Sequence, residues 1–263
     1  MNTVLTIAGT DPTGGAGLHA DLKTFCAHGV YGMGVVTAVV AQNTCGVLAY
    51  DPVQPALLAA QLDAVFSDIF PDAVKIGMLP DTASIQAVAA ALEKWQARRV
   101  ILDPVMVSTS EHRLQHADAA AVMAEMLFPR CELITPNLAE AATLCGFPVT
   151  NRSEVERAAE TIFKKYGTSV LVTGGHLENS CDDLLFDGNG PVWIPGHRVE
   201  TENTHGTGCT LSAAIAANRA RGETLRDAVA HAKSYVLGAL SRSLNLGKGN
   251  GPLDHCSAGS TGR

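Results

Sequence analysis

Short runs of apolar residues alternate along this chain with longer stretches in which apolar residues recur at helical spacing. The short, β-branched runs predict strands at residues 4–8, 35–40, 74–76, 100–102, 133–134 and 169–172. The longer stretches predict helices at residues 18–27, 55–66, 83–95, 117–127, 138–144, 153–166, 209–219 and 225–240. This strand–helix rhythm indicates a three-layer α/β fold, with a mostly parallel central sheet and helices on both faces.

Residues 182–199 interrupt the rhythm, because turn residues there separate short apolar runs. That pattern predicts a hairpin at an edge of the sheet. The sequence contains neither an internal repeat nor a linker that would divide it. We therefore expect one domain over residues 1–256, followed by a disordered, Ser/Gly-rich tail at residues 257–263.

Composition narrows the class of protein. The 263 residues carry a net charge of −7 and no basic block, which argues against a nucleic-acid-binding or membrane-surface protein. No stretch approaches the roughly 18 apolar residues of a membrane span. The seven cysteines are odd in number and irregularly spaced, as expected for reduced thiols in a cytoplasmic protein.

Polar or glycine residues follow each predicted strand, where ligands of parallel sheets bind. They are Gly9–Asp11, Gln42–Asn43, Gly77–Met78, Asp103, Asn137 and Thr173–Gly174. The glycines at 9, 14, 15 and 17 do not form a dinucleotide fingerprint, and a P-loop and a nucleophile elbow are also missing. Six polar strand ends at one edge of the sheet predict a binding site, although the chain has none of these three motifs.

Several of these residues admit two interpretations. Asp21 is either a surface charge or a ligand-binding carboxylate, and Gln42 either ends a strand or pairs with the edge of a heterocycle. Met78 is by default a core residue. Asn137 and Glu140 form either a capping box or an oxygen pair for hydrated Mg²⁺. The last group, which could simply lie on the surface, is His205, Lys248 and His255.

The stretch from Asn203 to Ser212 is the most distinctive in the chain. Gly206 and Gly208 flank Thr207 and precede a run of small residues that predicts a tightly packed helix. A glycine turn that opens a helix exposes N–H groups to an anion, most often phosphate. The same position favours the thiolate of Cys209. The alternative interpretation is a tight turn with an inert buried cysteine.

These residues resemble a known family. The matching segments are residues 6–17, 20–25, 37–44, 75–79, 103–106, 135–141, 203–212 and 247–252. Together they are similar to the bacterial hydroxymethylpyrimidine/phosphomethylpyrimidine kinases of thiamine biosynthesis, in the ribokinase-like superfamily. The resemblance implies a ribokinase-like fold and a homodimer. It also implies transfer of the γ-phosphoryl group of ATP, with Mg²⁺, to 4-amino-5-hydroxymethyl-2-methylpyrimidine and then to its monophosphate.

The resemblance also implies roles for single residues. Gln42 would pair with the pyrimidine, and the residues lining that pocket would be Gly9, Asp21, Met78 and Val105. The turn formed by Gly206, Thr207, Gly208 and Cys209 would bind the transferring phosphate. Cys209 stands where sugar kinases of the superfamily have an aspartate base, so its thiolate could accept the hydroxyl proton. Asn137 and Glu140 would hold Mg²⁺ through water, with Asp103 nearby.

Two departures from the family pattern concern the nucleotide. Family members often have lysines where this chain has Thr109 and Thr173, so phosphate neutralisation would rely more on Mg²⁺, His205 and Lys248, and nucleotide affinity would be lower. A pyridoxal/pyridoxine kinase is the alternative enzyme, although B6-specific relatives usually lack glutamine at position 42. A non-catalytic pyrimidine-binding protein is the alternative from another class.

Overall fold

An eight-stranded sheet forms the centre of the molecule in the computed structural model, which describes residues 1–105, 117–175, 177, 180–242 and 244–256. Its strand order is β10-β9-β8-β7-β6-β5-β1-β2. The parallel strands are β1 (Thr3–Ala8), β2 (Tyr31–Val36), β5 (Ala73–Ile76), β6 (Val100–Leu102), β7 (Leu133–Ile134) and β8 (Ser169–Val172). The antiparallel pair β9 (Asp183–Phe186) and β10 (Pro191–Ile194) completes one edge, which confirms the hairpin predicted there.

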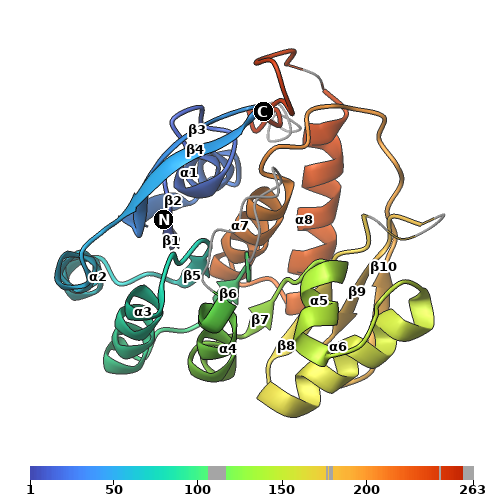
Figure 1. The fold of residues 1–263 in the computed structure, drawn as a ribbon, viewed down its shortest axis with the longest axis horizontal. Coiled ribbons are helices and arrows are strands. Elements are labelled where there is room, and N and C mark those ends of the chain that lie inside the picture. The colour runs from blue at the N-terminus through green and yellow to red at the C-terminus, as the bar shows by residue number, and fades with distance from the viewer. Residues whose placement is uncertain (106–116, 176, 178–179, 243, 257–263) are drawn as a thin grey trace.

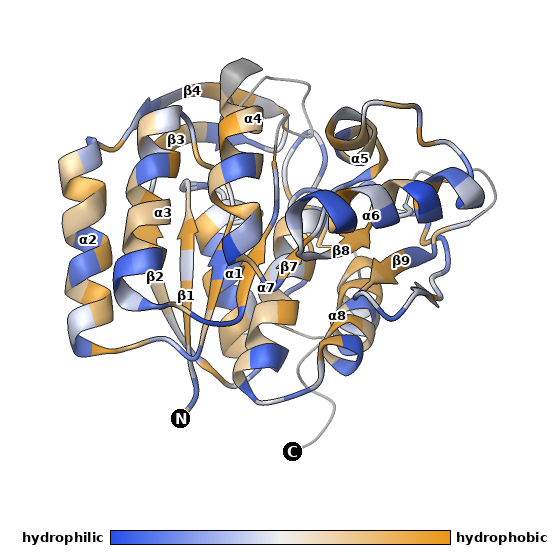
Figure 2. Cartoon of the chain, turned by 90° about the horizontal axis from the view of Figure 1, so that it is seen from below, coloured by the Kyte–Doolittle hydropathy of each residue, from blue (hydrophilic) through white to orange (hydrophobic). Residues whose placement is uncertain are grey.

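Helices cover both faces of the sheet, which confirms the three-layer α/β prediction (Figure 1). One face carries α1 (Gly17–Ala27), α7 (Thr207–Ala220) and α8 (Leu225–Leu240). The other carries α2 (Pro55–Asp68), α3 (Thr82–Trp95), α4 (Ala117–Met126), the short 3₁₀ helix η1 (Phe128–Arg130), α5 (Leu138–Cys145) and α6 (Arg152–Tyr166). The helices turn their apolar sides toward the strands (Figure 2).

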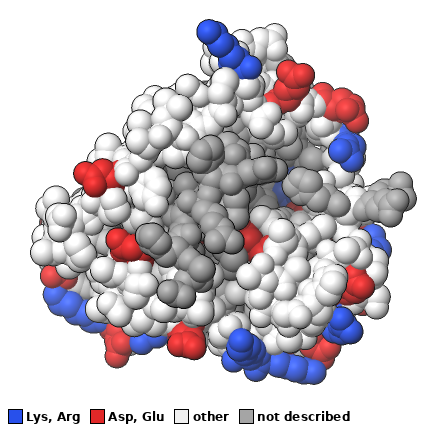
Figure 3. All heavy atoms as spheres, in the orientation of Figure 1, with Lys and Arg blue, Asp and Glu red and all other residues white. Residues whose placement is uncertain are grey.

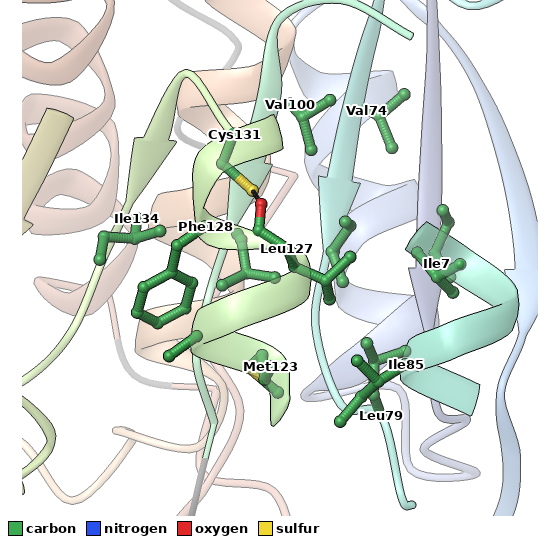
Figure 4. Close-up of a cluster of buried hydrophobic side chains, with 14 of the residues drawn as sticks. Ile7, Val74, Leu79, Ile85, Val100, Met123, Leu127, Phe128, Cys131 and Ile134 are labelled. Atoms are coloured by element: carbon green, nitrogen blue, oxygen red, sulfur yellow. Dashed lines mark hydrogen bonds between the residues drawn. The ribbon is translucent and has the colours of Figure 1, made fainter. Parts of the chain in front are cut away.

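The alternation of side chains along each strand divides the core into two layers. In β1, Val4 packs in the layer under α7 and α8, whereas Leu5 and Ile7 pack in the layer under α2–α6. Figure 4 shows the second layer, where the strand residue Ile7 lies near Ile85 of α3. Because both faces are buried, the central strands are apolar throughout, as parallel strands usually are.

The prediction for the second strand was wrong. Residues 35–40 do not form one strand, since the chain leaves β2 at Val36 and enters a separate two-stranded sheet of β3 (Ala38–Asn43) and β4 (Gly46–Pro52). Two glycines in β2 made this strand hard to predict from the sequence. A Cβ on Gly32 would lie 2.9 Å from the Phe25 ring, and one on Gly34 would lie 2.9 Å from Leu18, so both positions need glycine. Their absence of side chains lets α1 pack directly on β2.

The tail at residues 257–263 and the position of Thr109 lie outside the described residues. Within the described part of the chain, no helix is both long and apolar enough to span a membrane. Acidic and basic side chains are interspersed around the face seen in Figure 3, in keeping with the lack of a basic block in the sequence.

Candidate active site

The loop at residues 9–17, between β1 and α1, contacts both parts of the predicted site. At its start, a Cβ on Gly9 would lie 3.1 Å from the sulfur of Met78 and 3.4 Å from Val40 of β3. Near its end, a Cβ on Gly206 would overlap with the carbonyl oxygen of Gly15. This loop therefore joins the β3–β4 hairpin to the start of α7.

The β3–β4 hairpin stands over an apolar patch at the end of the main sheet. Its buried residues Ala38, Val40 and Val47 pack with Met78 and Val105. The hairpin base is fixed to the 9–17 loop, because Thr10 N–H donates to Ala38 O at 3.0 Å and Val40 N–H donates to Thr10 Oγ1 at 2.9 Å. The hairpin base is thus fixed to the loop that follows β1, beside Met78 and Val105.

Gln42 lies in β3 next to an irregularity in the hairpin. The pairing register shifts between Ala41 and Gln42, so that Gln42 pairs with Val47. Such bulges re-aim side chains and are frequent beside active sites. Gln42 therefore lies on a separate hairpin and does not follow a strand of the main sheet, as the sequence had suggested.

The turn before α7 presents an open helix start. Gly206 is the N-cap residue at φ 84°, a conformation that favours glycine, and it provides no side-chain cap for the first N–H groups. Gly208 is exposed, and a Cβ there would lie 3.5 Å from Asp103 Oδ2. The helix behind it is buried almost throughout, as predicted. This geometry provides N–H groups and a helix dipole for an anion.

His205 contacts the 9–17 loop through its ring. Its Nε2 lies 2.9 Å from Asp11 Oδ2, and both side chains are largely buried. Burial alone would raise the pKa of Asp11, but hydrogen bonds from His205, from Thr13 and from the Ala16 N–H hold it well below its usual range. Asp11 thus engages Nε2 of His205, and the expected contact of His205 with the nucleotide phosphates stays a prediction. His255 is likewise buried and bonds to Thr210 at 3.0 Å.

Four ionisable side chains gather beneath the start of α7: Asp21, Lys75, Asp103 and Cys209. Lys75 Nζ donates to both oxygens of Asp21, at 3.0 and 2.8 Å, and neither side chain is exposed. Burial alone would lower the pKa of Lys75, but Asp21, Cys209 and Asp103 raise it above its ordinary value, so Lys75 carries its charge. Sequence reasoning missed Lys75, although a lysine within the apolar strand β5 is a signal in itself.

The expected role of Asp21 changes as a result. Asp21 lies on α1, as predicted, but both its oxygens accept from Lys75, and Oδ2 also accepts from Thr6 at 2.5 Å. It is neither a surface charge nor a carboxylate open to a ligand. Its carboxylate lies within the buried cluster at the start of α7, bound by Lys75 and Thr6.

The expectation of a thiolate at Cys209 is wrong. Burial raises the pKa of Cys209 to about 11, and the opposing effect of Lys75 and of the Gly17 backbone does not compensate. The nearby carboxylates Asp103 and Asp21 raise it further. Cys209 is therefore a neutral thiol near pH 7.

Burial also raises the pKa of Asp103 to about 6, against the lowering effects of Lys75 and Ser212.

Asn137 and Glu140 form a capping box at the start of α5. Glu140 N–H donates to Asn137 Oδ1 at 3.0 Å, and Asn137 N–H donates to Glu140 Oε2 at 2.9 Å. Thr173, at the end of β8, forms a parallel bridge with Asn137, so these residues lie at adjacent strand ends. Among the described residues, no three His, Cys, Asp or Glu side chains form a cluster that could hold a metal ion directly.

Lys248 belongs to a glycine-rich segment, residues 247–251, that we call the glycine loop. Its own N–H and that of Gly249 each donate to Thr44 Oγ1 at 3.1 Å. On its other side, the loop lines a pocket of 630 Å³ together with residues 200–203. Gly247 and Gly249, which flank Lys248 in the chain, line this pocket.

Comparison with known proteins shows the family of the chain. A family model described as phosphomethylpyrimidine kinase matches residues 11–254. The chain is 49% identical over 255 residues to the hydroxymethylpyrimidine/phosphomethylpyrimidine kinase of Rhizobium meliloti (strain 1021), covering 95% of this chain and 96% of that protein.

Solved structures of two related kinases resemble the chain. The chain is similar to a phosphomethylpyrimidine kinase from Clostridium difficile 630, with a TM-score of 0.82, 38% identity and coverage of 91% of this chain and 99% of that one. It is also similar to an ADP complex of Bacillus subtilis pyridoxal kinase, with a TM-score of 0.89, 35% identity and coverage of 97% of each chain. The chain belongs to the phosphomethylpyrimidine kinase family of phosphotransferases.

Proposed function

We propose that the protein uses ATP to phosphorylate 4-amino-5-hydroxymethyl-2-methylpyrimidine and then its monophosphate, for thiamine biosynthesis. One observation carries this proposal: a single loop contacts both the apolar hairpin wall, at Gly9, and the open helix start, at Gly206. One small substrate could therefore place its flat heterocycle against the hairpin and its phosphate at the helix start. Family membership supports the same assignment.

The heterocycle would lie between the hairpin and the sheet edge. Met78 and Val105 offer apolar contact there, and Gly9 allows close approach because it has no side chain. The amide of Gln42 provides one donor and one acceptor for the ring nitrogen and amino group. Asp21 would act from below, by fixing Lys75 and the start of α1.

The transferring phosphoryl group would sit at the turn formed by Gly206, Thr207, Gly208 and Cys209. Phosphoryl transfer depends on positioning and charge stabilisation more than on covalent chemistry, and an uncapped helix start supplies both. The raised pKa of Cys209 argues against a resident thiolate base. Its proposed role is to contribute its backbone N–H and to line the pocket.

The nucleotide would occupy the 630 Å³ pocket beside the glycine loop. Its acidic lining by Glu200 and Glu202 suits hydroxyl and amino groups, so the phosphates would point away from it, toward Thr173 and α7. Lys248 remains the candidate cation on this side. Positions 109 and 173 lack the lysines that the family pattern offers, so we still expect weak nucleotide binding.

A magnesium ion would accompany the nucleotide. Mg²⁺ usually keeps several waters and uses one or two carboxylates with substrate phosphates, so the absence of a three-residue cluster among the described residues is compatible with it. Asp103 and Glu140 would hold it through water, with Asn137 orienting Glu140 through the capping box. When bound, the ion would neutralise phosphate charge.

Coupled ATP turnover with hydroxymethylpyrimidine, its monophosphate and pyridoxal tests the assignment. We expect turnover with both pyrimidines. Turnover with pyridoxal alone would favour the alternative enzyme, which the likeness to the Bacillus subtilis pyridoxal kinase keeps in consideration. No turnover with any of the three would favour a pyrimidine-binding protein without catalysis.

We also propose a cytoplasmic homodimer in which a single domain over residues 1–256 carries the whole site. All seven cysteines are free, which suits a reducing compartment. On the hairpin and α2, the large apolar residues Val39, Leu48 and Leu57 are more than half exposed. A second copy covering them would remove apolar surface from water. Sedimentation velocity on the wild type and Leu48→Glu would test this.

A further inference from the structure

The side chain of Thr44, at the tip of the hairpin, binds the glycine loop. The hydroxyl of Thr44 accepts two hydrogen bonds at 3.1 Å, from the N–H groups of Lys248 and Gly249. Thr44 and the glycine loop are far apart in the chain, and β3–β4 does not belong to the main sheet. Figure 1 shows the hairpin extending past α1 toward the segment that follows α8.

The fit at this contact is close on both sides of the glycine loop. A Cβ on Gly247 would overlap with Thr44 Oγ1, and one on Gly249 would overlap with the carbonyl oxygen of Thr44. Gly247 also has φ 90°, where side chains are strained. Each glycine is thus required by the position of Thr44, which explains the Gly-Lys-Gly pattern of the loop.

The glycine loop is in turn fixed to the turn before α7. Gly251 N–H donates to Glu202 O at 3.1 Å, and His205 N–H donates to Gly251 O at 3.1 Å. A Cβ on Gly251 would overlap with Asn203 Oδ1. The hairpin tip is therefore connected through Thr44 to the same turn that opens the helix start.

Gln42 depends on this connection. It precedes Thr44 by two residues and lies directly after the register shift, so only the pairs Gln42–Val47 and Asn43–Gly46 connect it to β4 on the side of the tip. The hairpin base is fixed at Thr10, so the tip is the end that a loss of the Thr44 bonds would release. An amide that must meet a heterocycle edge needs a fixed orientation to contribute its full binding free energy.

We propose that Thr44 is a positioning residue for the pyrimidine: by binding the glycine loop, it holds the hairpin tip and so orients Gln42 over the ring. This inference rests on the proposed function, because it places the pyrimidine under Gln42. It gives the glycine loop a second role, in holding the hairpin tip, besides its proposed place next to the nucleotide. The role is mechanical, since Thr44 itself need not touch the substrate.

The experiment compares Thr44→Val, which removes the acceptor at nearly constant volume, with Thr44→Ser, which keeps it. Thr161→Val on α6, whose hydroxyl bonds only within its helix at Arg157 O, is the matched control. In Thr44→Val we expect the KM for hydroxymethylpyrimidine to rise about tenfold, the scale of one or two lost hydrogen bonds. We expect the KM for ATP to change less than the KM for the pyrimidine, and Thr44→Ser and Thr161→Val to stay within about twofold of wild type.

Hydrogen–deuterium exchange separates this inference from the proposed function. In Thr44→Val, the amides of Lys248 and Gly249 should exchange faster without any substrate present. Unchanged exchange would overturn the contact itself, and an unchanged pyrimidine KM, or equal impairment in Thr44→Ser, would overturn the positioning role. Gln42→Ala tests the substrate placement separately: an unaltered pyrimidine KM there would overturn the proposed site while leaving the exchange result standing.

Discussion

Lys75 and Asp21 form an ion pair that is buried completely, with the ammonium 2.8 and 3.0 Å from the two carboxylate oxygens. The pair lies beneath the start of α7, beside Asp103 and Cys209. A Cβ on Gly77 would lie 2.8 Å from Lys75 Nζ, so the glycine that follows β5 leaves room for the ammonium. The cluster thus sets one ammonium against two carboxyl groups, so the charge of Lys75 is balanced by Asp21 within it.

Lys75→Met should destabilise the protein strongly. The substitution leaves the Asp21 carboxylate buried without its partner, and broken buried pairs typically cost about 3–5 kcal/mol in the free energy of unfolding. Urea unfolding measures this directly. The matched control is Lys94→Met, which breaks the Lys94–Asp63 pair on the surface and should have far less effect. If both variants unfolded at the wild-type urea concentration, the buried pair would have no part in stability.

Cys209 should react slowly with iodoacetamide at neutral pH. Only the thiolate is nucleophilic, and burial raises the pKa of this thiol to about 11. Peptide mapping after brief alkylation should find the exposed Cys26 and Cys45 modified first, and modification of Cys209 should increase only as the pH approaches 11.

The raised pKa of the Cys209 thiol also limits what Cys209 contributes to catalysis. Positioned general bases contribute about 10²–10⁴-fold to rate, so the loss in Cys209→Ser should stay below about tenfold if the thiol is no base. A loss of a hundredfold, together with rapid alkylation at pH 7, would restore the thiolate interpretation.

Much of the fold could be predicted from the sequence because it depends on local patterns. The helical spacing of apolar residues placed α8 at Leu225–Leu240, and the turn residues of 187–190 marked the edge hairpin β9–β10. The strand β2 could not be predicted in this way. Its Gly32 and Gly34 look like loop residues until α1 is packed against them, and that contact is tertiary.

The candidate site also contains residues that could be predicted from the sequence and contacts that could not. Residues at strand ends, such as Asp103 and Asn137, could be predicted because parallel strands end at one edge. Pairings between distant residues could not. The partner of Asp21 is 54 positions away, and the partner of His205 is 194 positions away, so local sequence gave no sign that either side chain would be occupied.

The two glycines of the turn before α7 should respond differently to alanine. In Gly206→Ala, the positive φ and the overlap with Gly15 O should destabilise the protein. In Gly208→Ala, the nearest atom lies at 3.5 Å, so the thermal midpoint should stay close to wild type. The added methyl group would nevertheless crowd the helix start, so kcat should fall at least tenfold. A fully active Gly208→Ala variant would move the phosphate away from this turn.

Glu140→Gln offers the sharpest test of the proposed metal role, since the chain contains a matched helix. At α5, Glu140 Oε2 accepts from Asn137 N–H, and at α6, Glu154 Oε2 accepts from Thr150 N–H beside the N-cap Asn151. Glutamine retains an oxygen acceptor at either position but removes the charge. Glu140→Gln should therefore raise the Mg²⁺ concentration for half-maximal activity severalfold with little change in thermal midpoint, because a hydrated Mg²⁺ loses an anionic partner. Glu154→Gln should leave the Mg²⁺ requirement unchanged. Equal Mg²⁺ curves for both variants and wild type would mean that Glu140 serves only to cap α5, which was the simpler interpretation of its spacing from Asn137.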